Sequence, residues 1–246
     1  MARDLRHVFD PAAWARDALG FESDPWQAGF LRAGESRVIL NTSRQVGKST
    51  VCALLACHQA IFRARSEIIV ISPSLRQSGE LFRKLVRFLG SLGTGAPLEE
   101  NRTTYVLPNG SRILSLPGSE DTVRGFSGVN LILMDEAARI DDDLLSAVTP
   151  MVATSGGRIV LLSTPAGRRG VFHKLWTDGE GWRKVRVPAA ECPRIPPGFL
   201  AAERLALGET LFRQEYACEF VDDLTAVFSM DAIHACRDDS IQPLHF

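Results

Sequence analysis

The chain has 246 residues, of which 45% are hydrophobic, so it can bury the core of one large domain with or without a small appendage. Its formal net charge of −1 gives no overall attraction for nucleic acid, so any DNA contact would have to come from local basic patches. The five cysteines form no C-x-x-C pair, which argues against a zinc site and a disulfide framework, and no apolar run approaches the length of a membrane-spanning helix. The sequence therefore predicts a soluble, cytosolic protein.

Five short apolar runs predict the strands of one central sheet. They are rich in Leu and β-branched residues and lie at 37–41, 67–72, 130–135, 158–163 and 182–187. Their nearly continuous apolarity is typical of strands that are buried on both faces of a largely parallel sheet. Helices are expected between them at 49–62, 75–89 and 142–148. This alternation predicts an α/β fold with three layers.

Two further features interrupt the alternation. The segments 103–107 and 111–116 flank Pro108-Asn109-Gly110, which predicts a β-hairpin inserted at an edge of the sheet. After Pro188 the sequence becomes rich in proline and then continues as a helical run over 199–220. We therefore expect a core domain over 1–188, a small accessory subdomain over 189–222 and a tail over 223–246.

A phosphate-binding loop is predicted directly after the first strand, where residues 42–50 read Thr-Ser-Arg-Gln-Val-Gly-Lys-Ser-Thr. In such a loop, backbone N–H groups and the N-terminus of the next helix surround a phosphate. Lys48 would neutralise the phosphate charge, and Ser49 would reach a magnesium ion. The loop residues expected to bind ATP are Thr42, Ser43, Gln45, Val46, Gly47, Lys48, Ser49 and Thr50. The alternative is that Gly47 only caps a turn and Lys48 is solvated.

Two carboxylates, Asp135 and Glu136, end the third strand. Asp135 could hold magnesium beside the loop, directly or through water. Glu136 could then polarise the water that attacks the γ-phosphate, because Asp135 would be committed to the metal. Alone, the pair could equally cap the strand, but after a phosphate loop it predicts hydrolysis of ATP rather than simple binding.

The string Ser163-Thr164-Pro165 follows the next strand, whose end should lie beside Asp135 in the sheet. Its hydroxyls could hydrogen-bond both the region of the catalytic water and a moving loop, which would couple hydrolysis to motion. A turn stiffened by Pro165 explains the same residues almost as well.

A helix is expected to begin upstream of the loop, with Asp24 as its N-cap and Pro25 as its first residue. Gln27 could read the edge of an adenine base, because its amide both donates and accepts hydrogen bonds. Trp26 is expected in the core.

Two arginines are candidates for stabilising the charge of the transition state. Arg44 belongs to the phosphate loop and could act only within its own subunit or on a nearby switch. Arg124 lies on a glycine-flanked loop before the strand that carries Asp135 and could reach a neighbouring subunit. For both, a surface or structural role is the alternative.

Basic residues recur in two places where they could track DNA phosphates. The first group lies on the polar side of the helix expected at 75–89, where a solvated face explains it equally well, and consists of Arg76, Arg83, Lys84 and Arg87. The second group directly follows Pro165, which makes it the better candidate for DNA binding, and consists of Arg168, Arg169 and Lys174.

In combination, these motifs resemble those of the ATPase domain of the large terminase subunit, the DNA-packaging motor of tailed bacteriophages. The family's phosphate loop, Ser-Arg-Gln-x-Gly-Lys-Ser/Thr, is matched at 43–49 and begins, as here, without the usual first glycine. The family's Trp-Gln, Ile-x-x-Asp-Glu-Ala and Ser-Thr-Pro strings are matched at 26–27, 132–137 and 163–165. The segment 212–220 resembles the end of the family's lid subdomain, and the resemblance as a whole extends over about 24–228.

The resemblance implies a RecA-like P-loop core of the additional-strand, catalytic-glutamate type, with a small C-terminal lid subdomain over 189–222. It implies ATP hydrolysis with Mg²⁺ that drives double-stranded DNA into a viral procapsid in the host cytoplasm. The implied partners are the DNA, the viral portal, the small terminase subunit and further copies of the chain in a pentameric ring. It also implies a C-terminal nuclease, but the sequence stops at Phe246, so we expect no nuclease activity from this chain.

Three other functions share some of these motifs. A superfamily 2 helicase-like translocase has similar strings but would need a second RecA-like domain. A nucleotide-binding scaffold would bind ATP without turnover. A nucleotide kinase would have no use for Glu136 or for the string Ser163-Thr164-Pro165.

Overall fold

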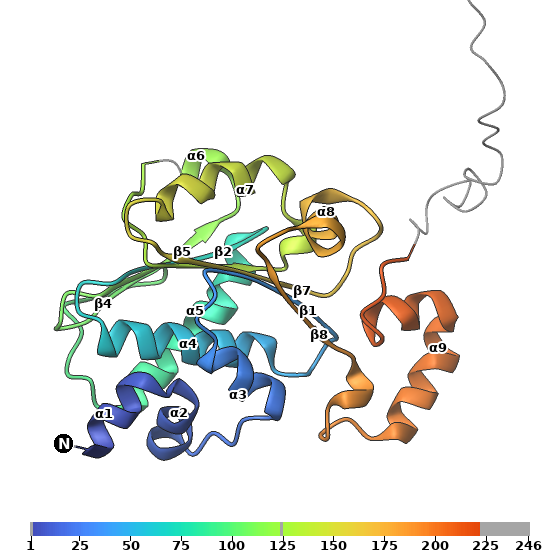
Figure 1. The fold of residues 1–246 in the computed structure, drawn as a ribbon, viewed down its shortest axis with the longest axis horizontal. Helices are drawn as coiled ribbons and strands as arrows, with labels where there is room; N and C mark the ends of the chain where they lie inside the picture. Colours follow the sequence, from blue (N-terminus) through green and yellow to red (C-terminus); the bar gives the residue numbers. More distant parts are fainter. Residues whose placement is uncertain (1, 124, 222–246) are drawn as a thin grey trace, which may run out of the picture.

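A sheet of eight strands forms the centre of the protein, with helices on both of its faces (Figure 1). The computed structural model describes residues 2–123 and 125–221, and within them the strand order is β3-β4-β5-β2-β6-β7-β1-β8. Arg124 and the predicted tail over 223–246 lie outside the described residues. The three-layer α/β fold that the sequence predicts is confirmed.

The five predicted core strands are all present, each within one residue of its predicted bounds. They are β1 (Arg37–Thr42), β2 (Glu67–Ser72), β6 (Leu131–Asp135), β7 (Arg158–Ser163) and β8 (Arg183–Val187). β1 pairs with β7 and β8, and β6 pairs with β2 and β7, always in parallel. Parallel strands place their carboxyl ends at the same edge of the sheet, so the segments that follow these strands can meet there.

The predicted hairpin is also confirmed, at the far edge of the sheet. β4 (Thr104–Val106) and β5 (Arg112–Pro117) are antiparallel, and the two-residue β3 (Glu99–Glu100) pairs with β4 outside them. β5 pairs in parallel with β2 as well, so the hairpin continues the central sheet.

The side chains of each central strand alternate between two hydrophobic cores. In β1, Val38 and Leu40 belong to the core that contains α4 (Lys48–Phe62), whereas Ile39 belongs to the core on the opposite face. The same alternation holds in β2, β6 and β7. Because helices cover both faces, every position of these strands favours an apolar side chain, which explains the continuous apolar runs in the sequence.

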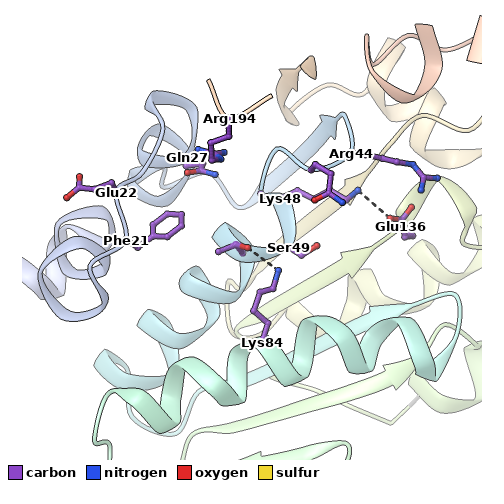
Figure 2. A pocket seen from close by; sticks show the side chains of 12 residues that line it. Phe21, Glu22, Gln27, Arg44, Lys48, Ser49, Lys84, Glu136 and Arg194 are labelled. Atoms are coloured by element: carbon purple, nitrogen blue, oxygen red, sulfur yellow. Dashed lines mark hydrogen bonds and ion pairs between the residues drawn. The ribbon is translucent and has the colours of Figure 1, made fainter. Parts of the chain in front are cut away.

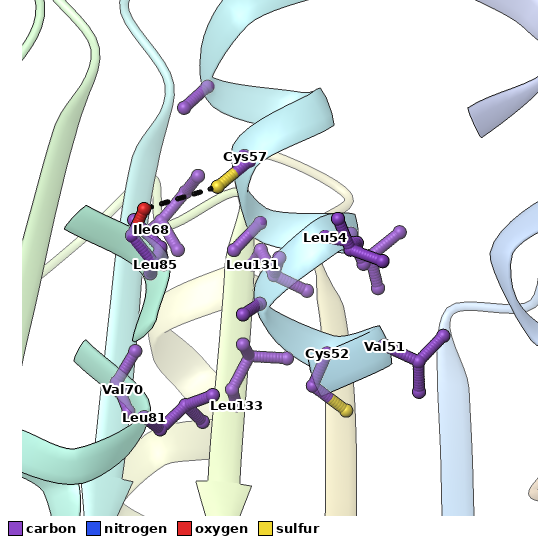
Figure 3. Packing of buried hydrophobic residues seen from close by; sticks show 14 of the residues in the cluster. Val51, Cys52, Leu54, Cys57, Ile68, Val70, Leu81, Leu85, Leu131 and Leu133 are labelled. Atoms are coloured by element: carbon purple, nitrogen blue, oxygen red, sulfur yellow. Dashed lines mark hydrogen bonds between the residues drawn. The ribbon is translucent and has the colours of Figure 1, made fainter. Parts of the chain in front are cut away.

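One helical layer consists of α1 (Ala2–Phe9), α2 (Pro11–Leu19), α3 (Pro25–Arg32), α4 and α5 (Leu75–Ser91). Side chains of α4 pack between α5 and the strands β2 and β6, and Cys57 Sγ lies 3.6 Å from the carbonyl oxygen of Leu85 (Figure 3). The four described cysteines are buried and free, as predicted for small core residues. None of the helices within the described residues is long and apolar enough to cross a membrane.

The other layer consists of α6 (Glu120–Val123), α7 (Asp142–Val148) and α8 (Gly170–Asp178), with the 3-10 turns η1 (Ala137–Arg139) and η2 (Thr149–Val152). In the sheet between the layers, β7 lies between β1 and β6. Its register places Leu162 opposite Asp135 and Ser163 opposite Asn41. The strand that ends at Ser163 therefore lies beside Asp135, as the sequence predicts, and it is the additional strand of the expected core.

The chain after β8 forms the 3-10 turn η3 (Ala189–Glu191) and the helical segment α9 (Pro197–Glu215), which lies beyond the β8 edge of the sheet (Figure 1). Gly208, with a φ of 75°, interrupts α9 with a kink. The prediction of a helix up to residue 220 is wrong, because α9 stops at Glu215. The chain then turns back: Arg44 N donates to the carbonyl oxygen of Glu215 at 3.3 Å, and Asn41 Nδ2 donates to that of Cys218 at 3.0 Å. These bonds replace further helical turns and bring Glu215 next to the phosphate loop.

Candidate active site

A cavity of about 540 Å³ opens at the start of α4, next to the carboxyl end of β1 (Figure 2). Its walls come from the segment between α2 and α3, the phosphate loop, α5, the end of β6 and the segment before α9. The lining residues are Phe21, Glu22, Gln27, Arg44, Gln45, Gly47, Lys48, Ser49, Thr50, Lys84, Glu136 and Arg194.

The phosphate loop connects β1 to α4 as predicted, and Gly47 precedes the first helical residue. Gly47 has a φ of 94°, and a Cβ at this position would lie 2.7 Å from Nε2 of Gln27. The left-handed backbone favours glycine, and a larger residue would also have to displace the amide of Gln27. The N-terminus of α4 is directed at the cavity, where Lys48, Ser49 and Thr50 lie in its wall, as a phosphate site requires.

The predicted loop residues divide into two groups. Thr42, Ser43 and Val46 are fully buried and do not line the cavity. The residues that line the cavity are Gln45, Gly47, Lys48, Ser49 and Thr50.

Asp135 lies at the end of β6 and is only 8% exposed. Its burial raises the pKa of the carboxyl group to about 6, although the charges of Lys48 and Lys84 act in the opposite direction. No cluster of three or more acidic, His or Cys side chains suited to a metal occurs in the described part of the chain. The oxygens of Asp135 and Ser49 suit Mg²⁺, which commonly takes one or two protein oxygens and completes its shell with phosphates and water.

Glu136 lines the cavity and contacts two cations. Its Oε1 lies 3.4 Å from Lys48 Nζ, and its Oε2 accepts a hydrogen bond from Arg139 Nη1 at 2.8 Å. The backbone of Glu136 is left-handed, with a φ of 53°, which turns the chain from β6 into η1. The two predicted elements, phosphate loop and catalytic carboxylate, are thus brought into direct contact.

Arg139 is a residue of the site that the sequence interpretation missed. Besides Glu136, its Nη1 donates to Oγ1 of Thr164 at 3.3 Å, and its Nη2 lies 3.9 Å from Oε1 of Glu215. Glu215 in turn forms an ion pair with Arg44. The spacing of three residues between Glu136 and Arg139 is the signal in the sequence that could have revealed the pair.

The predicted coupling string lies immediately after β7, and Ser163, Thr164 and Pro165 are all buried. Arg139 links Thr164 to Glu136, because its Nη1 donates to both side chains. The hydroxyl of Ser163 is buried and has no hydrogen-bond partner within the described residues.

Gln27 is buried and joins α3 to the phosphate loop. Its Oε1 accepts from the Asp24 backbone N–H at 3.0 Å, and its Nε2 donates to the carbonyl oxygen of Val46 at 3.2 Å. Arg194 supports the same carbonyl at 3.2 Å while both of its Nη atoms donate to Asp24 at 2.7 Å. The preceding residue, Trp26, is partly buried against two apolar clusters, in line with its expected place in the core.

The two predicted basic groups have different surroundings. In the first group, Arg76, Arg83 and Arg87 are exposed. Lys84 does not share this solvated face: its side chain reaches the cavity and donates a hydrogen bond to Thr50 Oγ1 at 3.0 Å. The three residues of the second group, Arg168, Arg169 and Lys174, are exposed around the start of α8 and do not line the cavity. Arg124 lies outside the described residues, so its proposed approach to a neighbouring subunit stays a prediction.

The chain is similar to large terminase subunits of bacteriophages. The family model described as "Terminase large subunit, T4likevirus-type, N-terminal" matches residues 39–235. The large terminase subunit of Thermus phage G20c is 24% identical over an alignment of 251 positions, gaps included, that covers 87% of this chain and 52% of that protein. This chain thus spans about half the length of the curated relatives that it matches.

Two solved structures show the likeness of the fold. The large terminase ATPase domain of Thermus phage P74-26 matches with a TM-score of 0.72 at 20% identity, over 86% of this chain and 99% of that one. The large terminase of another thermophilic bacteriophage, in complex with ADP, matches with a TM-score of 0.64 at 13% identity, over 89% and 53% of the two chains. The expected RecA-like P-loop fold is confirmed by these matches. Since the family model covers most of the residues, the chain belongs to the terminase large subunit family, T4likevirus type, of which it matches the N-terminal region.

Proposed function

We propose that this chain hydrolyses Mg²⁺-ATP in the cavity between the phosphate loop and Glu136, and that hydrolysis drives the translocation of double-stranded DNA into a viral procapsid. The observation that carries the proposal is the contact of Lys48 with Glu136, 3.4 Å apart in the wall of a cavity of about 540 Å³. It unites a phosphate-binding cation with a carboxylate able to accept a proton from water. A large terminase to which this fold is similar has been solved with ADP bound.

In this proposal one end of the cavity binds the phosphates and Mg²⁺, and the other end binds the base. Lys48 and the amides at the start of α4 bind the phosphates, and Ser49 and Asp135 hold Mg²⁺, which would offset phosphate charge when bound. Phe21 lies at the end of the cavity away from Glu136 (Figure 2), where its ring could stack on the base. Gln27 borders the same end, and its amide retains one hydrogen and one lone pair with which to read adenine.

Glu136 is proposed as the general base. Its carboxylate is shared between Lys48 and Arg139, so both of its oxygens are engaged while these contacts persist. A γ-phosphate would compete for the ammonium group of Lys48, and its binding would therefore release one of the two contacts. Glu136 could then orient and deprotonate the attacking water, and Arg44 would stabilise the transition state from within the same subunit.

We propose that Arg139 transmits conformational changes from the site to the rest of the domain. Its guanidinium group contacts both Thr164 of the coupling string and Glu215 at the end of α9. The proposed division of the chain is a core over 1–188, a lid over 189–222 and a tail over 223–246. Arg168, Arg169 and Lys174 are proposed to contact DNA phosphates. The proposed assembly is a pentameric ring that works with the viral portal and the small terminase subunit in the host cytoplasm.

Phosphate release by the full chain tests the proposal. Glu136→Gln keeps the shape of the side chain but removes its charge, so it should bind ATP and hydrolyse it at least about a hundredfold more slowly. Lys48→Ala should lose binding as well as turnover. Wild-type protein that binds ATP without releasing phosphate would instead be a nucleotide-binding scaffold.

A further inference from the structure

Four cationic side chains line the cavity, and three of them are neutralised by a carboxylate. The ion pairs are Arg44 with Glu215, Lys48 with Glu136, and Arg194 with Asp24. Lys84 is the fourth cation, and no carboxylate among the described residues lies within ion-pair distance of it. Its hydrogen-bond partner is the hydroxyl of Thr50, at 3.0 Å.

The position of Lys84 follows from the packing of α5. Leu81 and Leu85 of this helix are buried in the core shared with α4, and Lys84 lies beside them at helical spacing. Because Leu81 lies three residues before Lys84 on the same face of the helix, the aliphatic stem of Lys84 can follow the apolar surface while its ammonium group reaches the start of α4. Figure 2 shows the side chain projecting from α5 toward Ser49.

This environment is unfavourable for a cation without an anion. The group is half-buried, and burial lowers the pKa of Lys84, while the nearby charge of Asp135 acts in the opposite direction. A neutral hydroxyl compensates only part of the lost hydration of an ammonium ion. An anion in the cavity would supply the missing partner.

We propose that Lys84 is a nucleotide ligand that binds the α-phosphate. In loops of this type the lysine reaches the β- and γ-phosphates and the following hydroxyl reaches the metal. Here these positions are Lys48 and Ser49, and Lys84 contacts the next residue, Thr50, one position further into α4. In the view of Figure 2, Lys84 lies between Phe21, at the proposed base end, and Glu136. The inference rests on the proposed function and assigns a second cation to the same site.

The test is the binding of Mg²⁺-ADP and Mg²⁺-ATPγS to the full chain by titration calorimetry. Lys84→Met keeps the length of the stem and removes the charge, so both nucleotides should bind about ten- to a hundredfold more weakly, by the same factor. Lys84→Arg should recover most of the affinity. The matched control is Arg87→Met, since Arg87 is exposed on the same helix and should leave binding unchanged.

Steady-state hydrolysis adds a second readout. An α-phosphate contact is the same in the ground state and the transition state, so Lys84→Met should raise KM and leave kcat near the wild-type value. A loss of affinity confined to ATPγS would overturn the assignment to the α-phosphate. Unchanged binding of both nucleotides with a lower melting temperature would show that Lys84 only anchors α5 to α4. Wild-type protein that binds neither nucleotide would overturn the proposed function together with this inference.

Discussion

Arg139 donates from Nη1 to Oε2 of Glu136 at 2.8 Å, and through this contact the proposed general base is connected to two distant parts of the chain. The same guanidinium group reaches Thr164 after β7 and Glu215 at the end of α9. A planar group with several donors can hold three partners in fixed directions, which a lysine could not do.

We expect Arg139→Ala to lower kcat for ATP hydrolysis by about tenfold or more with little change in KM, because Glu136 would lose its orientation while the phosphate loop stays intact. Arg139→Lys should retain the charge but only part of the rate. Nucleotide binding by calorimetry and phosphate release on the same samples check this. Equal losses of binding and turnover would mean that Arg139 only supports the fold.

Gly47→Ala should abolish nucleotide binding. The new Cβ would lie 2.7 Å from Gln27 Nε2, and the φ of 94° disfavours any residue with a side chain, at a cost of about 1–3 kcal/mol. In a Gln27→Ala background, where the clash is absent, Gly47→Ala should cost only the backbone strain and should therefore lower the stability by less than it does in the wild-type protein. Gly34→Ala is the control, because a Cβ there meets nothing within 4 Å. Thermal unfolding and ADP titration measure both effects.

Gln27→Ala alone should reduce the preference for ATP over GTP. The amide borders the end of the cavity where we place the base, and it also fixes the loop through Val46. The ratio of kcat/KM for the two nucleotides should move toward one, while the rate with ATP falls. An unchanged ratio with a lower rate for both nucleotides would show that Gln27 only fixes the phosphate loop and does not recognise the base.

Arg124 is expected to act across a subunit interface, whereas Arg44 acts within its own subunit. Arg124→Ala subunits mixed with Glu136→Gln subunits should therefore recover part of the ATPase activity, because each supplies the group that the other lacks. A finger arginine contributes on the order of 10³-fold or more in rate, so partial recovery would stand above background. Arg44→Ala mixed in the same way should show no recovery. The measurement requires that the assembly of the subunits is verified. If Arg124→Ala then shows no recovery, Arg124 acts in the site of its own subunit or only supports the fold.

Much of the fold and part of the site could be predicted because their signals are local. Four of the five core strands, β1, β2, β6 and β7, are buried on both faces and carry continuous apolar runs, which located them within one residue. β8 was located as well, but it lies at the edge of the sheet and its burial alternates, so the expectation of burial on both faces is wrong for this strand. The phosphate loop and the Asp135-Glu136 pair are contiguous strings, and the parallel order of the strands already implied that they meet at one edge. The end of α9 could not be predicted, because the chain leaves the helix at Glu215 for bonds to residues far away in the sequence, such as Asn41.

The sequence by itself therefore determined where the phosphate loop and the two carboxylates lie, since each is a string of neighbouring residues in one short segment. Only the tertiary structure decided which other cationic side chains lie beside the phosphate loop and the carboxylates. Lys84 enters the cavity because the buried face of α5 packs on α4, and Arg139 meets Glu215 because the chain after α9 returns to the loop. Such contacts join segments separated by tens of residues, and their geometry follows from packing, which the local pattern of a sequence does not encode.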